Sequence, residues 1–397
     1  MRSGPVPCGC ERSVAEMTQA DGRSGVPAGS AEVSQGSPQK VTAGGLLVTR
    51  LRPGDVRQRG ALSVVPLFAD TTGGPWYDTL GEAVEKHGCQ VCEVNEGGSV
   101  PNLYVRNGGD TRVLILDGEE LRGAKQNRVL NTTILVDRQS DLTVPVSCTE
   151  AGRWSYESVH FAAAEYVAER RVRSRLRQSV ETSVRAGRGF ISDQGAVWDE
   201  VSMLHARQGT HSETGAMRGA FESKKAALQG YLDAVAPVDG QQGLLVLLGE
   251  RVVGLDFLSI PEKYARLHDK LVRSYALEAL GVDEAGDSDE AGKAPDAAVV
   301  REAAEAFLRR LGGLDGQRFK SPGLGWDVRF SGAGLVGSLL TYRGRPIHGA
   351  FFDVDGEPAD ARDPGSAPRG RSGRMTGARE RARNCRGSEG RDREGGR

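Results

Sequence analysis

Short apolar runs separated by turn-forming residues occupy the chain from about residue 46 to residue 148. The runs are brief and rich in β-branched residues, and Gly, Asn or Asp separates them, which is typical of strands. They follow one another too closely for helical crossovers, so we expect antiparallel pairing. One short helix is predicted at 77–87. The predicted strands are LLVTRL (46–51), LSVVPLF (62–68), VCEV (91–94), NLYV (102–105), RVLIL (112–116), TTILV (132–136) and LTVPVSC (142–148).

A helical spacing replaces this pattern further along the chain. Val172, Leu176, Val180 and Val184 recur every four residues and predict an amphipathic helix. The arginines between them are expected to form its solvent-exposed face, and a phosphate-binding patch is the less favoured alternative. Two more helices are predicted, at 194–208 and 214–235.

The last third of the folded part returns to strands. GLLVLLGERVVGLDFL (243–258) predicts a hairpin that turns at Gly249-Glu250, and Pro261 marks the start of a helix. The order of strands, helices and strands predicts an α+β fold: a mostly antiparallel β region at about 46–148, a helical middle and closing β strands. The remaining predicted elements are an acidic loop at 281–297, a helix at 298–311 and strands in DVRFSG, GLVGSLLTYRG and PIHGAFFDV.

Both ends of the 397-residue chain differ in composition from the part between them. Residues 1–43 are rich in Gly, Ser, Pro and Ala without periodicity, and residues 356–397 contain almost no apolar side chain. Such segments bury too little apolar surface to offset the entropy cost of ordering. We therefore predict a disordered N-terminal tail, a disordered Arg-rich C-terminal tail and, at 44–355, one α+β domain or two packed subdomains.

Charge further separates the C-terminal tail from the rest. Residues 361–397 hold eleven Arg and five acidic residues, a net charge near +6, and subtracting it from the chain's −1 leaves about −7. A mildly acidic folded part argues against nucleic-acid binding by that part. For the tail, a solubilising role is favoured over contact with polyanions.

Compartment is predicted from three features. No apolar run approaches the roughly 18 residues of a membrane span, and the N-terminus lacks the apolar core of a signal peptide. Six cysteines in this length fit a reducing environment. We expect a cytoplasmic protein without membrane contact.

Residues 118–131, GEELRGAKQNRVLN, carry eight polar side chains of mixed charge directly after a predicted strand. A phosphate-binding P-loop requires G-x-x-x-x-G-K-[ST]. Gly118 and Gly123 have that spacing, but Ala124 stands where the Lys is needed, Lys125 comes one position late, and Gln126 follows it in place of the hydroxyl. The stretch is therefore not a P-loop.

The same stretch suits ligand recognition in another way. The amides of Gln126 and Asn127 both donate and accept hydrogen bonds, which suits the edge of a base or an amide. Lys125 and Arg128 suit a phosphate or a carboxylate, which Arg binds in bidentate fashion.

A second polar cluster, Glu150, Arg153 and Trp154 in CTEAGRW, also follows a predicted strand. Trp154 is suited to stacking on a base or ribose, and Arg153 and Glu119 join the candidate ligand site. Glu120 and Glu150 are the candidate general acid or base. An internal network of hydrogen bonds and ion pairs that joins the strand ends explains these residues equally well, so both interpretations stay open.

The cysteines and histidines offer weaker chemistry. Cys89 and Cys92 form a C-x-x-C pair, but a zinc site needs two further ligands, and a redox pair favours a helix N-terminus. Cys148 is a candidate nucleophile with His160 as base, although buried structural thiols are favoured for all three cysteines. The histidines show no H-x-x-x-H pairing, so no metal site is predicted.

Three segments, LDGEELRGAKQNRVLN, VPVSCTEAGRW and HSETGAM, resemble the protein family named for its association with ADP-ribosylglycohydrolases and rhodanese-phosphatases. The resemblance spans about 45–355. It implies an α+β domain with no established activity or cofactor, and the name implies work near ADP-ribose, NAD or related phospho-metabolites. The motif positions carried over, without roles, are Glu119, Glu120, Lys125, Gln126, Asn127, Arg128, Cys148, Glu150, Arg153 and Trp154.

Two functional hypotheses follow. In the first, which we prefer, the domain binds or processes a nucleotide-derived phospho-metabolite, such as ADP-ribose or an NAD-related compound, in a polar pocket built from the two motifs. In the second, the domain is a non-catalytic scaffold or protein-interaction module, and the motifs form a buried polar network. A cysteine-dependent hydrolase or transferase acting through Cys148 is a third possibility. The ligand, the cofactor, the protein partners and the existence of any catalysis stay unassigned.

Overall fold

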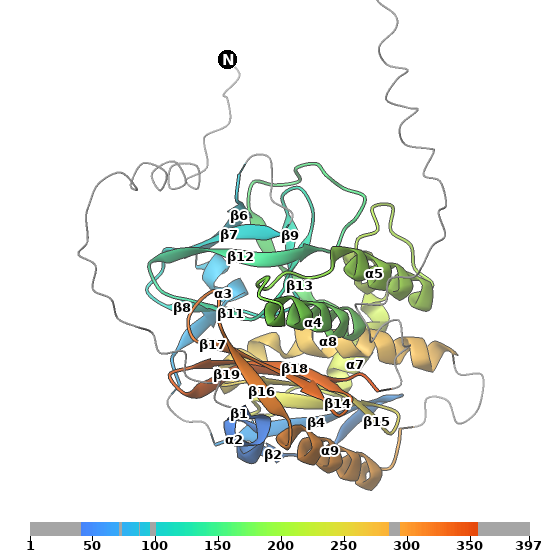
Figure 1. Cartoon of the computed structure of the whole chain (residues 1–397). Coiled ribbons are helices and arrows are strands. Elements are labelled where there is room, and N and C mark those ends of the chain that lie inside the picture. The colour runs from blue at the N-terminus through green and yellow to red at the C-terminus, as the bar shows by residue number, and fades with distance from the viewer. Residues whose placement is uncertain (1–40, 71–73, 87, 96–100, 286–293, 356–397) are drawn as a thin grey trace, which may run out of the picture. The chain divides into compact units, whose positions relative to one another are not determined.

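The structure, a computed structural model, describes residues 41–70, 74–86, 88–95, 101–285 and 294–355. Strands and helices segregate along these residues (Figure 1), which confirms the predicted α+β class. The predicted disordered tails lie outside the described residues, except for residues 41–43.

The largest sheet in the described part of the chain has ten antiparallel strands, taken from both ends of the folded region (Figure 1). Its spatial order is β1-β16-β17-β18-β19-β15-β14-β4-β2, and β3 also pairs with β4. Side chains alternate across it, so Leu244 and Val246 enter one core while Leu245 and Leu247 enter another. The bounds are β1 (Val41–Thr42), β2 (Leu51–Pro53), β3 (Arg57–Arg59), β4 (Leu62–Ala69), β14 (Gly243–Leu248), β15 (Arg251–Leu258), β16 (Asp315–Lys320), β17 (Trp326–Gly332), β18 (Leu335–Tyr342) and β19 (Arg345–Asp353).

Two smaller sheets lie within residues 77–167. An antiparallel sheet has the order β13-β9-β10-β12-β7-β6, and a three-stranded sheet has the order β11-β8-β5. The β5–β8 pair is parallel, an exception to the predicted antiparallel pairing. Phe161 on the first strand of the larger of these sheets and Val91 on its last strand share one apolar core, so this sheet is curled. The bounds are β5 (Tyr77–Thr79), β6 (Cys89–Glu93), β7 (Asn102–Asn107), β8 (Arg112–Ile115), β9 (Glu119–Gly123), β10 (Arg128–Leu130), β11 (Ile134–Val136), β12 (Ser140–Cys148) and β13 (Phe161–Val167).

Helices cover both faces of the large sheet (Figure 1). One face packs against α4, α7 and α8, and the other packs against α9, while α5 packs against α4 and β12. The four predicted core residues of α4 are all buried in the first of these cores. The bounds are α2 (Ala43–Leu46), the 3₁₀ helix η2 (Val48–Arg50), α3 (Leu80–Glu85), α4 (Arg170–Arg185), α5 (Gln194–Gln208), α6 (Arg218–Ser223), α7 (Lys225–Ala234), α8 (Pro261–Ala285) and α9 (Ala297–Gly312). None of the helices in the described residues is long and apolar enough to cross a membrane.

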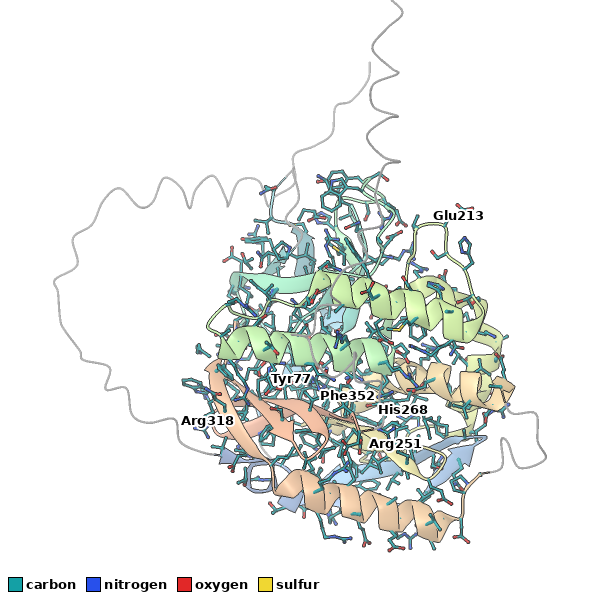
Figure 2. All side chains as sticks on the ribbon, turned by 45° about the vertical axis from the view of Figure 1, so that its right-hand side comes forward. Tyr77, Glu213, Arg251, His268, Arg318 and Phe352 are labelled. Atoms are coloured by element: carbon teal, nitrogen blue, oxygen red, sulfur yellow. The ribbon has the colours of Figure 1, made fainter. Side chains whose placement is uncertain are left out.

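The arginines of α4 do not form a solvent-exposed face, so that prediction is wrong. Arg173 and Arg177 are buried, and their guanidinium carbons both lie 5.0 Å from the ring centroid of Phe352 on β19, which Figure 2 labels. Arg173 forms an ion pair with Asp256, and Arg177 forms one with Asp117. Because α4 is buried on several sides, acidic residues of other elements neutralise its buried arginines.

Several predicted boundaries also change. The segment 46–51, expected to be a strand, is mostly helical, because it contains the end of α2 and all of η2. Thr42 caps the N-terminus of α2, since its Oγ1 accepts a hydrogen bond from Gly45 N. The expected helix at 77–87 starts with strand β5, and a capping box of Thr79 and Glu82 begins α3. The helix expected at 214–235 is divided into α6 and α7, and β16 was not predicted. The acidic loop begins later than expected because α8 continues to Ala285, and residues 286–293 lie outside the described residues.

Candidate functional site

The first motif is a β-hairpin formed by β9 and β10. Strand β9 ends at Gly123, where φ is 121°, and Ala124 follows with φ 42°. The side chain of Asn127 closes the turn, because its Oδ1 accepts a hydrogen bond of 3.2 Å from Gly123 N. The hairpin sets Arg128 beside Leu121 on β9 and beside Cys148 on β12.

Three strands bring polar side chains together at their ends. Arg128 is the first residue of β10, Cys148 is the last of β12 and Glu93 is the last of β6. Arg128 Nη1 donates hydrogen bonds of 2.8 Å to Gln126 Oε1 and to Cys148 Sγ. Arg128 Nη2 lies 3.9 Å from Glu93 Oε1, and both side chains are buried. We call Glu93, Arg128 and Cys148 the strand-end cluster.

Glu93 was not predicted as a site residue. Its signal in the sequence is a break in alternation: Cys89 and Val91 face the apolar core of the curled sheet, and Glu93 continues the same face with a carboxylate. A charged residue on the buried face of a strand is unusual unless it is paired. This signal can be recognised once the inward face of β6 is known.

Aromatic rings of the second motif lie over the cations of the first. Lys125 Nζ is 5.5 Å from the ring centroid of Trp154 and 5.0 Å from that of Tyr156. The guanidinium carbon of Arg128 is 5.7 Å from the same Trp154 centroid. Trp154 and Tyr156 are 49% and 54% exposed, so much of each ring faces solvent. The two motifs thus converge on one surface, which we call the cation–aromatic surface.

Three further motif residues bind mainly to one another. Arg153 donates to Glu150 Oε2 from Nε (3.0 Å) and Nη2 (2.7 Å), and to Asn127 Oδ1 (3.2 Å). Burial alone would raise the pKa of Glu150, but hydrogen bonds from Arg153, Thr214 and the Asn127 N–H outweigh it and lower that pKa. Arg153 Nη1 also donates to Ala124 O at 2.8 Å, which fixes the hairpin turn to the loop after β12.

The two glutamates of β9 have surroundings different from those of the strand-end cluster. Glu119 Oε1 accepts a hydrogen bond of 2.9 Å from Lys270 of α8. Glu120 pairs in register with Val129 and so lies on the face of β9 opposite to Leu121 and Arg128. Burial raises the pKa of Glu120 to about 7, although Arg218 opposes the shift.

The three cysteines in the described residues are buried. Cys89 and Cys92 are structural thiols, as expected, and they lie in separate cores on opposite faces of β6. Burial raises the pKa of the Cys148 thiol in spite of the nearby Arg128. His160, its candidate base, is an exposed residue next to β13.

A second group of titratable side chains escaped the sequence analysis. His348 Nδ1 lies 2.7 Å from Thr133 Oγ1 and 3.6 Å from Asp117 Oδ1, while its Nε2 lies 3.8 Å from Asp256 Oδ1. Burial lowers the pKa of His348. Asp256 and His348 stand in otherwise apolar runs, GLDFL and PIHGAFF, and only the fold brings them together with α4. Since Arg173 and Arg177 neutralise the two aspartates, we interpret the group as a structural network.

A cavity of about 350 Å³ lies elsewhere, between α4 and the β17–β18 hairpin. Its lining includes Gln178, Thr182, Leu335 and Val336, and no residue of the two motifs.

Comparison with known proteins gives one family. The model of the ARG and Rhodanese-Phosphatase-superfamily-associated Protein domain matches residues 50–352, which include both motifs and the strand-end cluster. This match confirms the resemblance found in the sequence. No curated protein and no solved structure matches the chain.

Proposed function

The chain belongs to the ARG and Rhodanese-Phosphatase-superfamily-associated Protein family, and from that premise we propose that it binds a nucleotide-derived phospho-metabolite, such as ADP-ribose or an NAD-related compound, at the cation–aromatic surface. The family's name, which states an association with ADP-ribosylglycohydrolases, loosely fits such a ligand. The physical support comes from side chains of both motifs.

The observation that carries the proposal is the position of Lys125 and Arg128 around the half-exposed ring of Trp154. An exposed indole stacks a base or nicotinamide ring, a contact worth about 1–3 kcal/mol per base. An ammonium group at the edge of such a stack binds phosphate as a point charge, and the buried guanidinium of Arg128 adds positive charge beneath the ring. A ligand with an aromatic ring next to a phosphate matches both kinds of group.

The other predicted residues receive supporting roles in this proposal. Gln126 orients Arg128 through its hydrogen bond of 2.8 Å. Asn127, Glu150 and Arg153 hold the hairpin turn that carries Lys125. Since Glu119 pairs with Lys270 on α8, we assign it to the packing of β9 and not to ligand contact.

For processing of the ligand, Glu120 is the stronger of the two acid–base candidates. Its pKa of about 7 suits proton transfer at neutral pH, whereas the pKa of Glu150 is lowered. Glu120 is, however, buried on the other face of β9, so the proposal here is one of binding.

The scaffold alternative also has an observation in its favour. Glu150, Arg153 and Asn127 satisfy one another through several hydrogen bonds, which is what a structural network joining strand ends requires. The two hypotheses differ over Lys125 and Trp154, which a purely structural network does not need at a solvent-exposed surface.

The test is a calorimetric titration of the full chain with ADP-ribose and with NAD, repeated with Lys125→Ala and Trp154→Ala. The matched controls are Lys320→Ala and Trp326→Ala, because Lys320 Nζ lies 5.9 Å from the centroid of the 47% exposed Trp326 on a different surface. We expect each motif variant to weaken binding by about tenfold or more, and the controls to bind as the wild type does.

Either of two results would overturn the proposal. One is a wild-type chain that binds neither ADP-ribose nor NAD. The other is binding that the motif variants and the control variants alter equally, which would locate the ligand elsewhere.

A further inference from the structure

Glu93 and Arg128 face each other with polar atoms that make no hydrogen bond within the described structure. Both carboxylate oxygens of Glu93 are buried and lack a hydrogen-bond partner, as do Nε and Nη2 of Arg128. The side chains are 4% and 0% exposed, and their nearest charged atoms are 3.9 Å apart. The pair therefore neutralises its charge without a direct hydrogen bond between its partners, and only Nη1 of Arg128 is hydrogen-bonded, to Gln126 and Cys148.

Such a pair is costly as a purely structural element. A buried donor or acceptor left unsatisfied destabilises the folded state, and does so more when it is charged. Elsewhere in the same protein, Arg173 and Asp256 meet through two direct hydrogen bonds of 3.0 and 2.5 Å. The strand-end cluster instead keeps its carboxylate and guanidinium too far apart for a direct bond.

The geometry fits one kind of third group. An oxygen atom set to one side of the Glu93–Arg128 axis lies within hydrogen-bond distance of both partners, since their separation is 3.9 Å. It must accept from Arg128 and donate to Glu93. A hydroxyl group does both, whereas an ionised phosphate only accepts and would meet the negative charge of Glu93.

We propose that Glu93 and Arg128 form a subsite for a neutral hydroxyl group of the ligand, as a ribose carries, behind the Trp154 ring. This inference rests on the proposed function for the rest of the ligand and divides the site by charge. Phosphate is bound at Lys125 on the outer side, and a sugar hydroxyl is bound between Glu93 and Arg128 on the inner side. Glu93 is then a specificity-determining residue that directs the phosphate outward.

The experiment uses two fragments so that the two halves of the site report separately. D-ribose carries hydroxyls without phosphate, and inorganic pyrophosphate carries phosphate without a carbon-bound hydroxyl. Each is titrated by ligand-observed NMR into the full chain and into Glu93→Gln, Lys125→Ala and Glu157→Gln. Glu157 is a matched control because its carboxylate belongs to the same region but is 48% exposed and paired with Arg153 and Arg122.

We expect Glu93→Gln to shift the two fragments in opposite directions. Ribose binding should weaken about tenfold, because a charge-assisted hydrogen bond becomes a neutral one. Pyrophosphate binding should stay equal or tighten, because a negative charge near the phosphate is removed. Damage to the fold would weaken both fragments, so the opposite signs identify a direct role.

Other results are equally informative. If ribose does not bind, or binds Glu93→Gln and Glu157→Gln as it binds the wild type, the hydroxyl subsite is refuted, and a buried water is what bridges the pair. If Glu93→Gln weakens ribose binding while Lys125→Ala leaves pyrophosphate binding unchanged, the hydroxyl subsite is supported and the proposed phosphate site is refuted.

Discussion

Arg173 and Asp256 meet through two hydrogen bonds, of 3.0 and 2.5 Å, between side chains that solvent does not reach. The pair joins α4 to β15, and Tyr275 of α8 donates a third hydrogen bond of 2.7 Å to the same carboxylate. Three elements are thus fixed around one acid. The pKa of Asp256 lies well below its usual range, because Arg173 outweighs the cost of burial.

Removing one partner of this pair should destabilise the fold strongly. We expect Arg173→Ala to lower the free energy of unfolding by about 3–5 kcal/mol, since it leaves Asp256 buried and uncompensated. Arg185→Ala on the same helix is the control, because its ion pair with Glu181 is partly exposed and worth about 0.5 kcal/mol. Urea unfolding of both variants gives the comparison. Equal losses would mean that burial of the pair has no special weight.

The network around Arg153 should also stabilise the fold. Arg153→Ala removes hydrogen bonds to Glu150, Asn127 and Ala124, and we expect a loss of about 3 kcal/mol. Lys125→Ala should leave thermal unfolding close to that of the wild type, because its ammonium lies over half-exposed rings. Differential scanning calorimetry separates the two. An unchanged melting temperature for Arg153→Ala would remove the support for a structural network.

Glu120 should make stability fall as the pH rises. Its pKa is about 7 in the folded chain against 4.5 for an ordinary glutamate, so the folded state keeps a proton that the unfolded chain has lost between these two pH values. The stabilisation is complete below pH 4.5 and is lost as the pH approaches about 7, with a total of about 3 kcal/mol. We therefore compare the free energy of unfolding of Glu120→Gln with that of the wild type at two pH values. The difference should favour the variant more at pH 8 than at pH 4.5.

Urea unfolding at the two pH values measures this gain. Burial also raises the pKa of Glu169 to about 7. The unfolding free energy of the variant therefore still depends on pH, but less steeply than that of the wild type. Glu157→Gln, at a 48% exposed carboxylate, should show no comparable difference. A Glu120→Gln variant whose stability tracks the wild type at both pH values would contradict the assignment.

Gly118 should tolerate a side chain poorly because of its backbone conformation and because of a close neighbour. Gly344 shares only the first of these features and so separates the two effects. Its φ is 72°, and an added Cβ would come within 2.9 Å of Arg173 Cγ. Gly344 has φ 74° but nothing within 4 Å of an added Cβ. We expect Gly344→Ala to cost about 1 kcal/mol from backbone strain alone, and Gly118→Ala to cost at least about 1 kcal/mol more from overpacking. Equal melting temperatures would show that α4 gives way without cost.

The sequence predicted those parts of the fold that follow from local periodicity. The β14–β15 hairpin, α4, α5 and α9 were found because apolar side chains recur at the spacing of their own element. The role of the α4 arginines was missed, because their burial depends on Asp117 and Asp256, which are 60 and 83 residues away. The apolar face of a helix can be predicted from the helix's own sequence, whereas burial of its polar face depends on which elements pack against it.

The candidate site divides in the same way. Both motifs were recognisable, and the convergence of Lys125 with Trp154 is a property of the fold that spacing alone does not give. The hairpin at 118–131 was missed because its strand β9 begins with two adjacent glutamates, which lack the alternation of a half-buried strand. Those glutamates fit there because Lys270 pairs with one of them and burial favours the neutral form of the other.

The division of the sheets along the chain has a consequence for the order in which the protein folds. All strand partners in the two smaller sheets lie within residues 77–167, whereas β4 must wait for β14, and β1 must wait for β16. During synthesis the smaller sheets can pair while the large sheet still lacks most of its strands. Closing the large sheet brings together segments separated by more than 170 residues, which makes it the slow step on loop-closure grounds. We therefore expect refolding kinetics in which the surroundings of Trp154 become ordered before those of Trp326.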